Sequence, residues 1–80
     1  MLLQLLSAAG FFAIVWPLPH AAVPGATYVL PTARGVVRAF VPVEGNELEL
    51  YAGRLLTGRL CYRGPLASEA ELRHLLAKAA

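Results

Sequence analysis

The first 33 residues of the chain contain no lysine, arginine, aspartate or glutamate, and this uncharged stretch limits the folds open to the sequence. It begins with MLLQLLSAAGFFAIVWPLP, in which apolar side chains would cover every face of a helix. A helix that is apolar all round is buried in protein or in lipid. The N-terminal segment therefore has to be covered by something other than water.

Two prolines limit the length of this predicted helix. Pro17 and Pro19 should end it, because proline lacks the backbone N–H and disfavours helix in the preceding residue. A helix over residues 2 to 16 would span about 22 Å, which is short of the roughly 30 Å hydrocarbon core of a bilayer. No basic residue precedes the apolar run, which argues against a cleaved export signal. We predict a helical segment over residues 1–19 that docks in a membrane or on a partner through Leu2, Leu3, Leu5, Leu6, Phe11, Phe12, Ile14, Val15 and Trp16.

The size and composition of the chain indicate that contact with another molecule or a membrane adds to its stability. Its 80 residues suffice for one domain, near the size at which a single core only just outweighs chain entropy. Hydrophobic residues make up 58% of the sequence and charged residues 15%, and the single cysteine, Cys61, excludes an internal disulfide. We therefore expect a protein partner, a homo-oligomer or a membrane surface to cover part of the chain.

Residues 26–80, after a Pro/Ala/Gly linker at 20–25, have the pattern of a small antiparallel β-meander. TYVL predicts a strand that ends at Pro31, and GVVRAFVPV predicts a second strand. Pro42 favours an edge or bulged position for the second strand, because it cannot donate to the ladder.

The next segments continue the meander. EGN predicts a hairpin connection, and ELELY predicts a strand with Leu48 and Leu50 on the buried face and Glu47, Glu49 and Tyr51 on the solvent face. Ala52-Gly53 is interpreted as a turn that leads into a further strand over residues 55–63, bent at Gly58.

The C-terminal residues predict an amphipathic helix. Ser68 stands at an N-cap position and Glu71 follows three residues later, which is the spacing of a capping box. Glu69 and Arg73 can pair one turn apart. The predicted fold class is therefore α+β: an N-terminal apolar helix, a β-meander and a C-terminal amphipathic helix.

The arginines are candidates for contact with an anionic partner. Arg34 and Arg38 follow the uncharged segment closely and suit acidic lipid headgroups or a partner's acids. Arg54, Arg59 and Arg63 alternate with Tyr51 and Tyr62, which are the residue types that a nucleic-acid-binding sheet uses for phosphates and bases. Arg59 and Arg63 share strand parity, whereas Tyr62 has the other, so the arginines and rings need not share a face.

No catalytic constellation stands out in the sequence. The absence of aspartate excludes a Ser-His-Asp triad, and one cysteine with two histidines cannot complete a zinc site. Cys61 is interpreted as a structural strand residue, His74 as a helix-boundary residue and His20 as a loop residue. The sequence predicts no catalytic residue, metal site or cofactor.

Three classes of function remain open. The first is a non-catalytic accessory or structural subunit that acts by protein–protein contacts, anchored through its apolar N-terminus in a membrane or a larger complex. Where the segment spans a bilayer, the arginine-bearing part would lie in the cytosol. The second is a structural subunit of a virion or secretion apparatus that is stabilised by assembly. The third, ranked behind both, is a small nucleic-acid-binding domain that uses an Arg/Tyr sheet.

Overall fold

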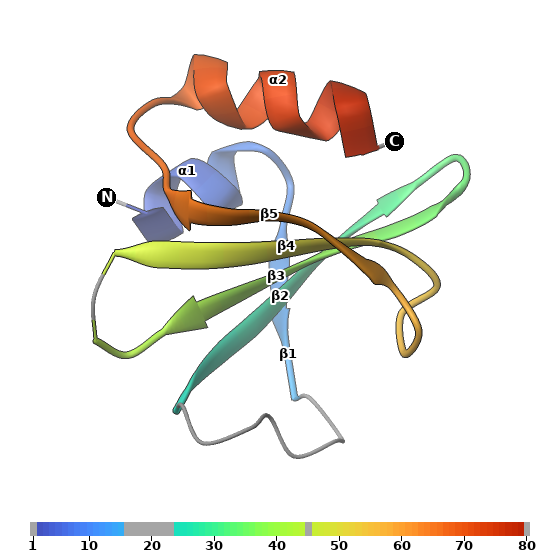
Figure 1. The fold of residues 1–80 in the computed structure, drawn as a ribbon, viewed down its shortest axis with the longest axis horizontal. Helices are drawn as coiled ribbons and strands as arrows, with labels where there is room; N and C mark the ends of the chain where they lie inside the picture. Colours follow the sequence, from blue (N-terminus) through green and yellow to red (C-terminus); the bar gives the residue numbers. More distant parts are fainter. Residues whose placement is uncertain (1, 16–23, 45, 80) are drawn as a thin grey trace.

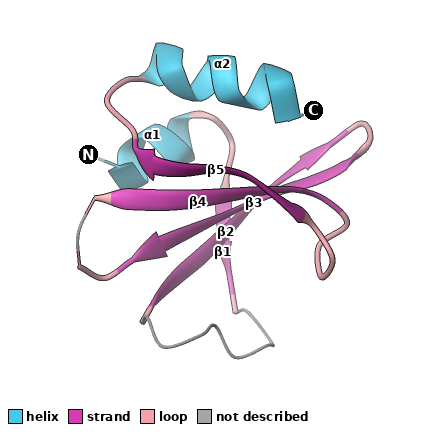
Figure 2. Cartoon of the chain, viewed as in Figure 1, coloured by secondary structure: helices cyan, strands magenta, loops and turns pink. Residues whose placement is uncertain are grey.

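Five antiparallel strands form a meander in the order β1-β2-β3-β4-β5, with a short helix before it and a longer helix after it (Figure 1). The computed structural model describes residues 2–15, 24–44 and 46–79. Its elements are α1 (Leu2–Ala8), β1 (Phe12–Ile14), β2 (Gly25–Thr32), β3 (Gly35–Pro42), β4 (Glu47–Gly53), β5 (Arg59–Pro65) and α2 (Glu69–Ala79). The α+β class and the meander are confirmed (Figure 2).

Helix α1 is shorter than predicted, because it ends at Ala8 rather than near Trp16. Gly10, with φ of +103°, lies just beyond the helix. The N–H of Phe11 donates to the carbonyl of Leu6 at 3.0 Å, and the N–H of Gly10 donates to the carbonyl of Ser7 at 3.0 Å. These two bonds define a Schellman motif, in which a glycine in a left-handed conformation ends the helix.

The residues after Gly10 form a strand instead of more helix. Phe12 to Ile14 pair with β2, and the register joins Phe12 to Val29 and Ile14 to Thr27. Trp16 and residues 17–23, to which we assigned the end of the helix and most of the linker, lie outside the described residues.

Several strands depart from the predicted bounds or positions. Strand β4 continues to Gly53, where we predicted a turn, and β5 spans Arg59–Pro65 rather than residues 55–63, because the turn lies at residues 54–57. Strand β2 continues through Pro31 to Thr32 rather than ending before the proline. Strand β3 is central rather than an edge. The N–H of Val43 points to β2, where it donates to the carbonyl of Pro24 at 3.0 Å, so the nitrogen of Pro42 points toward β4. Pairing with β4 has already ended at Phe40, and the missing N–H of Pro42 therefore costs no ladder bond.

One face of the sheet and both helices enclose the core. Its members come from α1, the turn after it, strands β3 and β4, the residue after β5, and α2: Leu6, Phe11, Val37, Ala39, Leu48, Leu50, Leu66 and Leu72. The predicted inward position of Leu48 and Leu50 is confirmed. Leu6 and Phe11, which we expected at an external interface, instead belong to the core of the chain itself, because the Schellman turn brings both against the sheet.

The predicted cap of α2 is present with one difference. The N–H of Glu71 donates to Ser68 Oγ at 3.2 Å, as a capping box requires. The Glu71 carboxylate, however, accepts from the N–H of Ala67 at 3.0 Å rather than from that of Ser68. The Arg73–Glu69 ion pair, at 3.3 Å, is also present.

The cap leads to a test of stability. Replacing Ser68 by alanine removes the acceptor of the Glu71 N–H, and we expect the free energy of unfolding to fall by about 1 kcal/mol. Urea unfolding followed by circular dichroism measures the change. The matched control is Ser7→Ala, since Ser7 is an exposed helical serine, and it should change stability by less than about 0.5 kcal/mol. Equal effects of the two substitutions would contradict the assigned cap.

Candidate functional site

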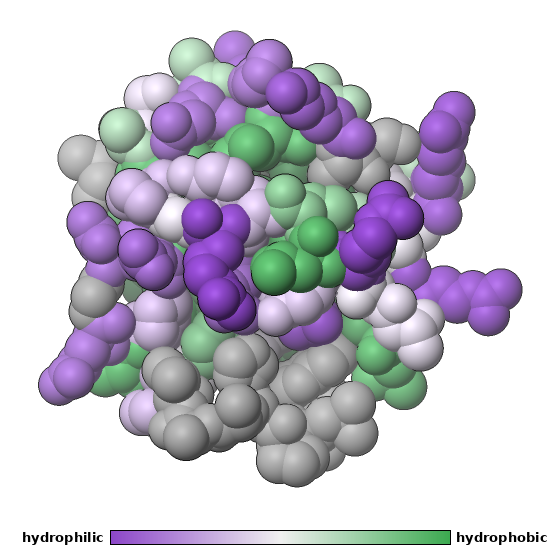
Figure 3. Space-filling view, in the orientation of Figure 1, coloured by the Kyte–Doolittle hydropathy of each residue, from purple (hydrophilic) through white to green (hydrophobic). Residues whose placement is uncertain are grey.

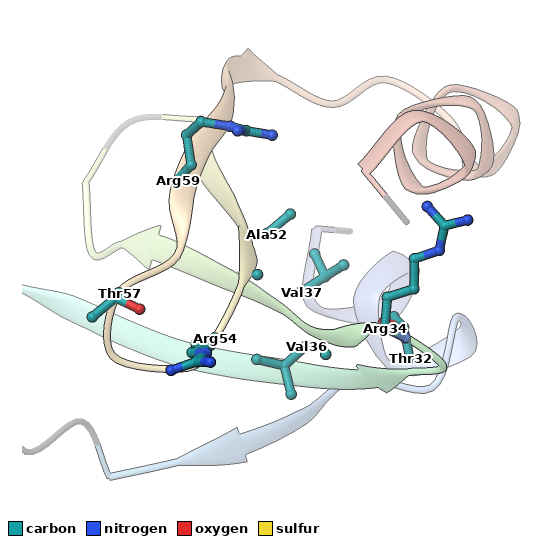
Figure 4. Close-up of a pocket in the computed structure, with 10 residues that line it drawn as sticks. Thr32, Arg34, Val36, Val37, Ala52, Arg54, Thr57 and Arg59 are labelled. Atoms are coloured by element: carbon teal, nitrogen blue, oxygen red, sulfur yellow. The ribbon is translucent and has the colours of Figure 1, made fainter.

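An open cavity of about 460 Å³ lies at one end of the sheet, where the turn between β2 and β3 meets the connection between β4 and β5 (Figure 4). Figure 4 shows Arg34 and Arg59 on either side of Val37 and Ala52, with Arg54 and Thr57 on the β4–β5 connection. Three of the lining side chains are arginines and two are threonines. The lining residues are Thr32, Arg34, Gly35, Val36, Val37, Ala52, Gly53, Arg54, Thr57 and Arg59.

The β2–β3 turn holds Arg34 at the cavity. The backbone N–H of Arg34 donates to Thr32 Oγ1 at 3.4 Å. Gly35 follows with φ of +154°, and a Cβ at this position would lie 2.5 Å from the carbonyl oxygen of Gly53. Only glycine permits this close approach of the start of β3 to the end of β4. The approach brings the two connections together around one cavity.

A β-bulge directs Arg59 toward the same cavity. The register of β4 and β5 shifts between Leu50, which pairs with Tyr62, and Tyr51, which pairs with Leu60, so Cys61 is an extra residue of β5. An extra residue reverses the alternation of faces along a strand. Arg59 therefore lies beside Ala52 on the face that carries the core.

None of the described residues that line the cavity is acidic. Among the residues that the structure describes, ion pairs join Arg63 to Glu49 and Arg73 to Glu69, and neither involves Arg34, Arg54 or Arg59. The three side chains are exposed. Guanidinium groups bind carboxylates and phosphates through two parallel hydrogen bonds, and the hydroxyls of Thr32 and Thr57 add further donors. The chemistry of the cavity suits an anion with several oxygen atoms.

The other two predicted arginines lie on the opposite face of the sheet, in a cluster of their own. The guanidinium carbon of the buried Arg38 lies 4.0 Å from the ring centroid of Tyr51. Tyr51 Oη donates to Glu49 Oε1 at 2.6 Å, and Arg63 Nη2 lies 2.9 Å from Glu49 Oε2. The cation–π contact and the charged hydrogen bonds link three neighbouring strands.

Burial shifts the pKa of two members of this cluster. Desolvation lowers the pKa of Arg38, and the nearby Tyr51 and Glu49 partly oppose that shift. Desolvation also raises the pKa of Tyr51, and the hydrogen bond to Glu49 adds to the shift. Glu49 was predicted on a solvated face, but its side chain is only 16% exposed and is paired with Arg63. This cluster therefore links β3, β4 and β5 to one another.

The structure thus separates the residues that we assigned to anion contact. Arg34, Arg54 and Arg59 surround one cavity, whereas Arg38 and Arg63 face the other side of the sheet. We expected Arg59 and Arg63 to lie on the same face of the sheet. The bulge at Cys61 places them on opposite faces instead. Tyr51 lies with Arg38, and Tyr62 lies on the core face with its hydroxyl donating to the carbonyl of Pro65 at 2.5 Å.

The residues that we predicted as an N-terminal interface include buried, partly buried and exposed side chains. Apart from Leu6 and Phe11 in the core, Leu2 and Leu5 pack against it and Ile14 is half-buried. Leu3, Phe12 and Val15 are exposed. No helix in the described part of the chain is long and apolar enough to cross a membrane.

Sequence reasoning missed the two threonines and the two glycines of the cavity. Thr32 and Gly35 frame Arg34 in TARG, which is a turn signal, and Gly53 and Thr57 frame the segment that we assigned to a turn and a strand. The residues in 2–15, 24–44 and 46–79 bring no three His, Cys, Asp or Glu side chains together to hold a metal ion. Cys61 is exposed, with its thiol 3.3 Å from the carbonyl of Arg59, and His74 is exposed on α2.

The raised pKa of Tyr51 predicts how stability depends on pH. The folded state favours the neutral phenol, so the contribution of this group is complete below the ordinary pKa of 10.0 and is lost as pH rises through the higher pKa of the folded state. Urea unfolding of the natural chain and of Tyr51→Phe, at pH values below and above 10.0, tests this. We expect the natural chain to lose more stability with rising pH than the variant. Equal losses would show that Tyr51 is not responsible.

Comparisons with protein-family models, with curated proteins and with solved structures found no match to this chain. The cavity joins two parts of the chain that are far apart in sequence, Thr32 to Gly35 and Gly53 to Arg59, at one end of the meander.

Proposed function

We propose that the chain is a non-catalytic accessory subunit that works by contact and binds an anionic group of its partner in the cavity between the β2–β3 turn and the β4–β5 connection. The observation that carries the proposal is the convergence of Arg34, Arg54 and Arg59 on one cavity whose described lining residues include no acid. The apolar-rich composition indicates a role in a complex or at a membrane. Contact between the cavity and an anionic group of the partner agrees with that role.

Electrostatics supports an anion as the natural occupant. Three guanidinium groups around one cavity repel one another, and nearby opposite charge relieves that repulsion. A bound anion would also stabilise the folded chain, because the unfolded chain does not bring the arginines together. The paired arginines elsewhere on the surface, Arg63 and Arg73, already have carboxylate partners. The cavity therefore offers the free binding capacity that an anionic partner needs.

The shape of the site supports binding rather than chemistry. The cavity is open, and its polar side chains are arginines and threonines carried on two connections. Arginine remains protonated at all physiological pH values, so it does not act as a general base there. Connections on a rigid sheet are typical places for recognition residues.

Inorganic tripolyphosphate is a suitable probe for this site, because it presents several anionic oxygens without any other chemical group. We expect the natural chain to bind it in isothermal titration calorimetry, with an affinity that falls as salt rises. Arg54→Ala and Arg59→Ala should each weaken binding about tenfold, since a hydrogen bond to a charged group contributes about 1.5–3 kcal/mol.

The matched control is Arg73→Ala, which removes the same charge from α2, away from the cavity. This variant should bind tripolyphosphate nearly as well as the natural chain. Equal weakening by Arg59→Ala and Arg73→Ala would show that net charge, and not the cavity, accounts for binding. Absence of binding by the natural chain would contradict the proposed function directly.

A further inference from the structure

The β4–β5 connection carries exposed leucines directly beside the arginines of the cavity. Leu55 and Leu56 follow Arg54 and are 36% and 55% exposed, and Leu60 follows Arg59 and is 43% exposed. Large apolar side chains on a water-facing connection cost solvation free energy unless another surface covers them. The seven residues from Arg54 to Leu60, RLLTGRL, thus contain two basic and three apolar side chains.

The neighbouring turn places a further basic side chain at the same end of the sheet. Arg34 reaches the cavity from the β2–β3 turn, opposite Arg59 (Figure 4). Figure 3 shows hydrophobic surface next to strongly hydrophilic side chains at the end of the molecule where the β4–β5 connection lies. This end combines positive charge with apolar surface, and the described acids do not line it.

We propose that this end of the sheet docks on the surface of a membrane that contains anionic phospholipids. Leu55 and Leu56 enter the boundary between headgroups and acyl chains, and Arg34, Arg54 and Arg59 bind the lipid phosphates and carboxylates. The inference rests on the proposed function, because it identifies the anionic group in the cavity as a lipid headgroup. It differs from a membrane-spanning anchor, since the chain would lie on the surface.

The combination of side chains explains why lipid is the favoured partner. Surface anchoring of this kind needs two signals, an apolar insertion and an electrostatic attraction to anionic lipids. The connection supplies the first through its leucines and the second through its arginines. A free phosphate compound would occupy the arginines but would leave Leu55 and Leu56 in water.

A nucleic acid fits this end less well. Binding of single strands uses exposed aromatic rings on which bases stack. Arg38 lies over the ring of Tyr51, and Tyr62 packs against the core, so neither ring lines the cavity in which the three arginines meet. The lining of the cavity contains no aromatic residue.

Sedimentation with vesicles tests the inference on the full chain. We expect the chain to sediment with vesicles of phosphatidylcholine mixed with phosphatidylserine and to remain in solution with phosphatidylcholine alone. Raising the salt concentration should release it. The double variant Leu55→Ser/Leu56→Ser should lose most of the vesicle binding and keep the affinity for tripolyphosphate. The double variant Arg54→Ala/Arg59→Ala should lose both.

Two control variants make the result specific to this surface. Leu3→Ser alters a leucine of α1 that is as exposed as Leu56, and Arg73→Ala removes a charge from α2. Both should bind vesicles as the natural chain does. Circular dichroism of every variant confirms that it is folded before binding is measured.

The outcomes separate the two proposals. Binding of tripolyphosphate without binding to anionic vesicles would overturn the lipid inference and leave the proposed function standing. Vesicle binding that survives Leu55→Ser/Leu56→Ser, or that Leu3→Ser abolishes equally, would also overturn the inference. Tighter binding to a single-stranded oligonucleotide than to anionic vesicles would identify nucleic acid as the partner. Absence of binding to both probes would overturn both proposals.

Discussion

The packing of Leu6 and Phe11 against the inner face of the sheet is the interaction on which the rest of the fold depends. A chain of this size buries a modest core, and few of its apolar side chains can be left unused. Gly10 ends α1 in a conformation that turns the chain back along β2, and Leu6 and Phe11 then share one core with residues of β3 and β4. Leu72 of α2 completes the same core. Part of the N-terminal segment that we predicted to anchor the chain therefore packs inside the domain.

Alternation and capping signals were enough to predict the central hairpin and the C-terminal helix. Leu48 and Leu50 alternate with polar residues, and Ser68 and Glu71 have cap spacing, so local pattern and tertiary contacts agree there. The end of α1 was missed because apolar composition suits a helix and a buried strand equally, although Gly10 was a visible stop signal. The site was only partly predictable: its arginines were identified, but not their grouping, because the bulge at Cys61 that redirects Arg59 has no local signature.

The two groups of arginines show how environment gives one residue type opposite roles. Arg38 lies over the ring of Tyr51, whose hydroxyl donates to the Glu49 carboxylate, and that carboxylate pairs with Arg63. Removing one member of such a cluster leaves a buried polar group without its partner, which destabilises the fold. Arg34, Arg54 and Arg59 lie in or next to the connections and are exposed, so they contribute little to stability. Burial and pairing, more than position in the sequence, distinguish the Arg38 cluster from the proposed binding site.

The exposed leucines lie close to the arginines in the chain because the same connection carries both. Strand β4 buries Leu48 and Leu50 in the core, but the connection between β4 and β5 extends beyond it, and Leu55 and Leu56 are exposed there. The close approach of Gly35 to Gly53 sets the β2–β3 turn beside that connection, so a rigid sheet presents charge and apolar surface together. A surface held in this way binds without first ordering a flexible loop, and less affinity is lost to conformational entropy. The sheet therefore presents a small contact surface. In the proposed docking, a membrane that contains acidic lipids matches both the arginines and the leucines of that surface.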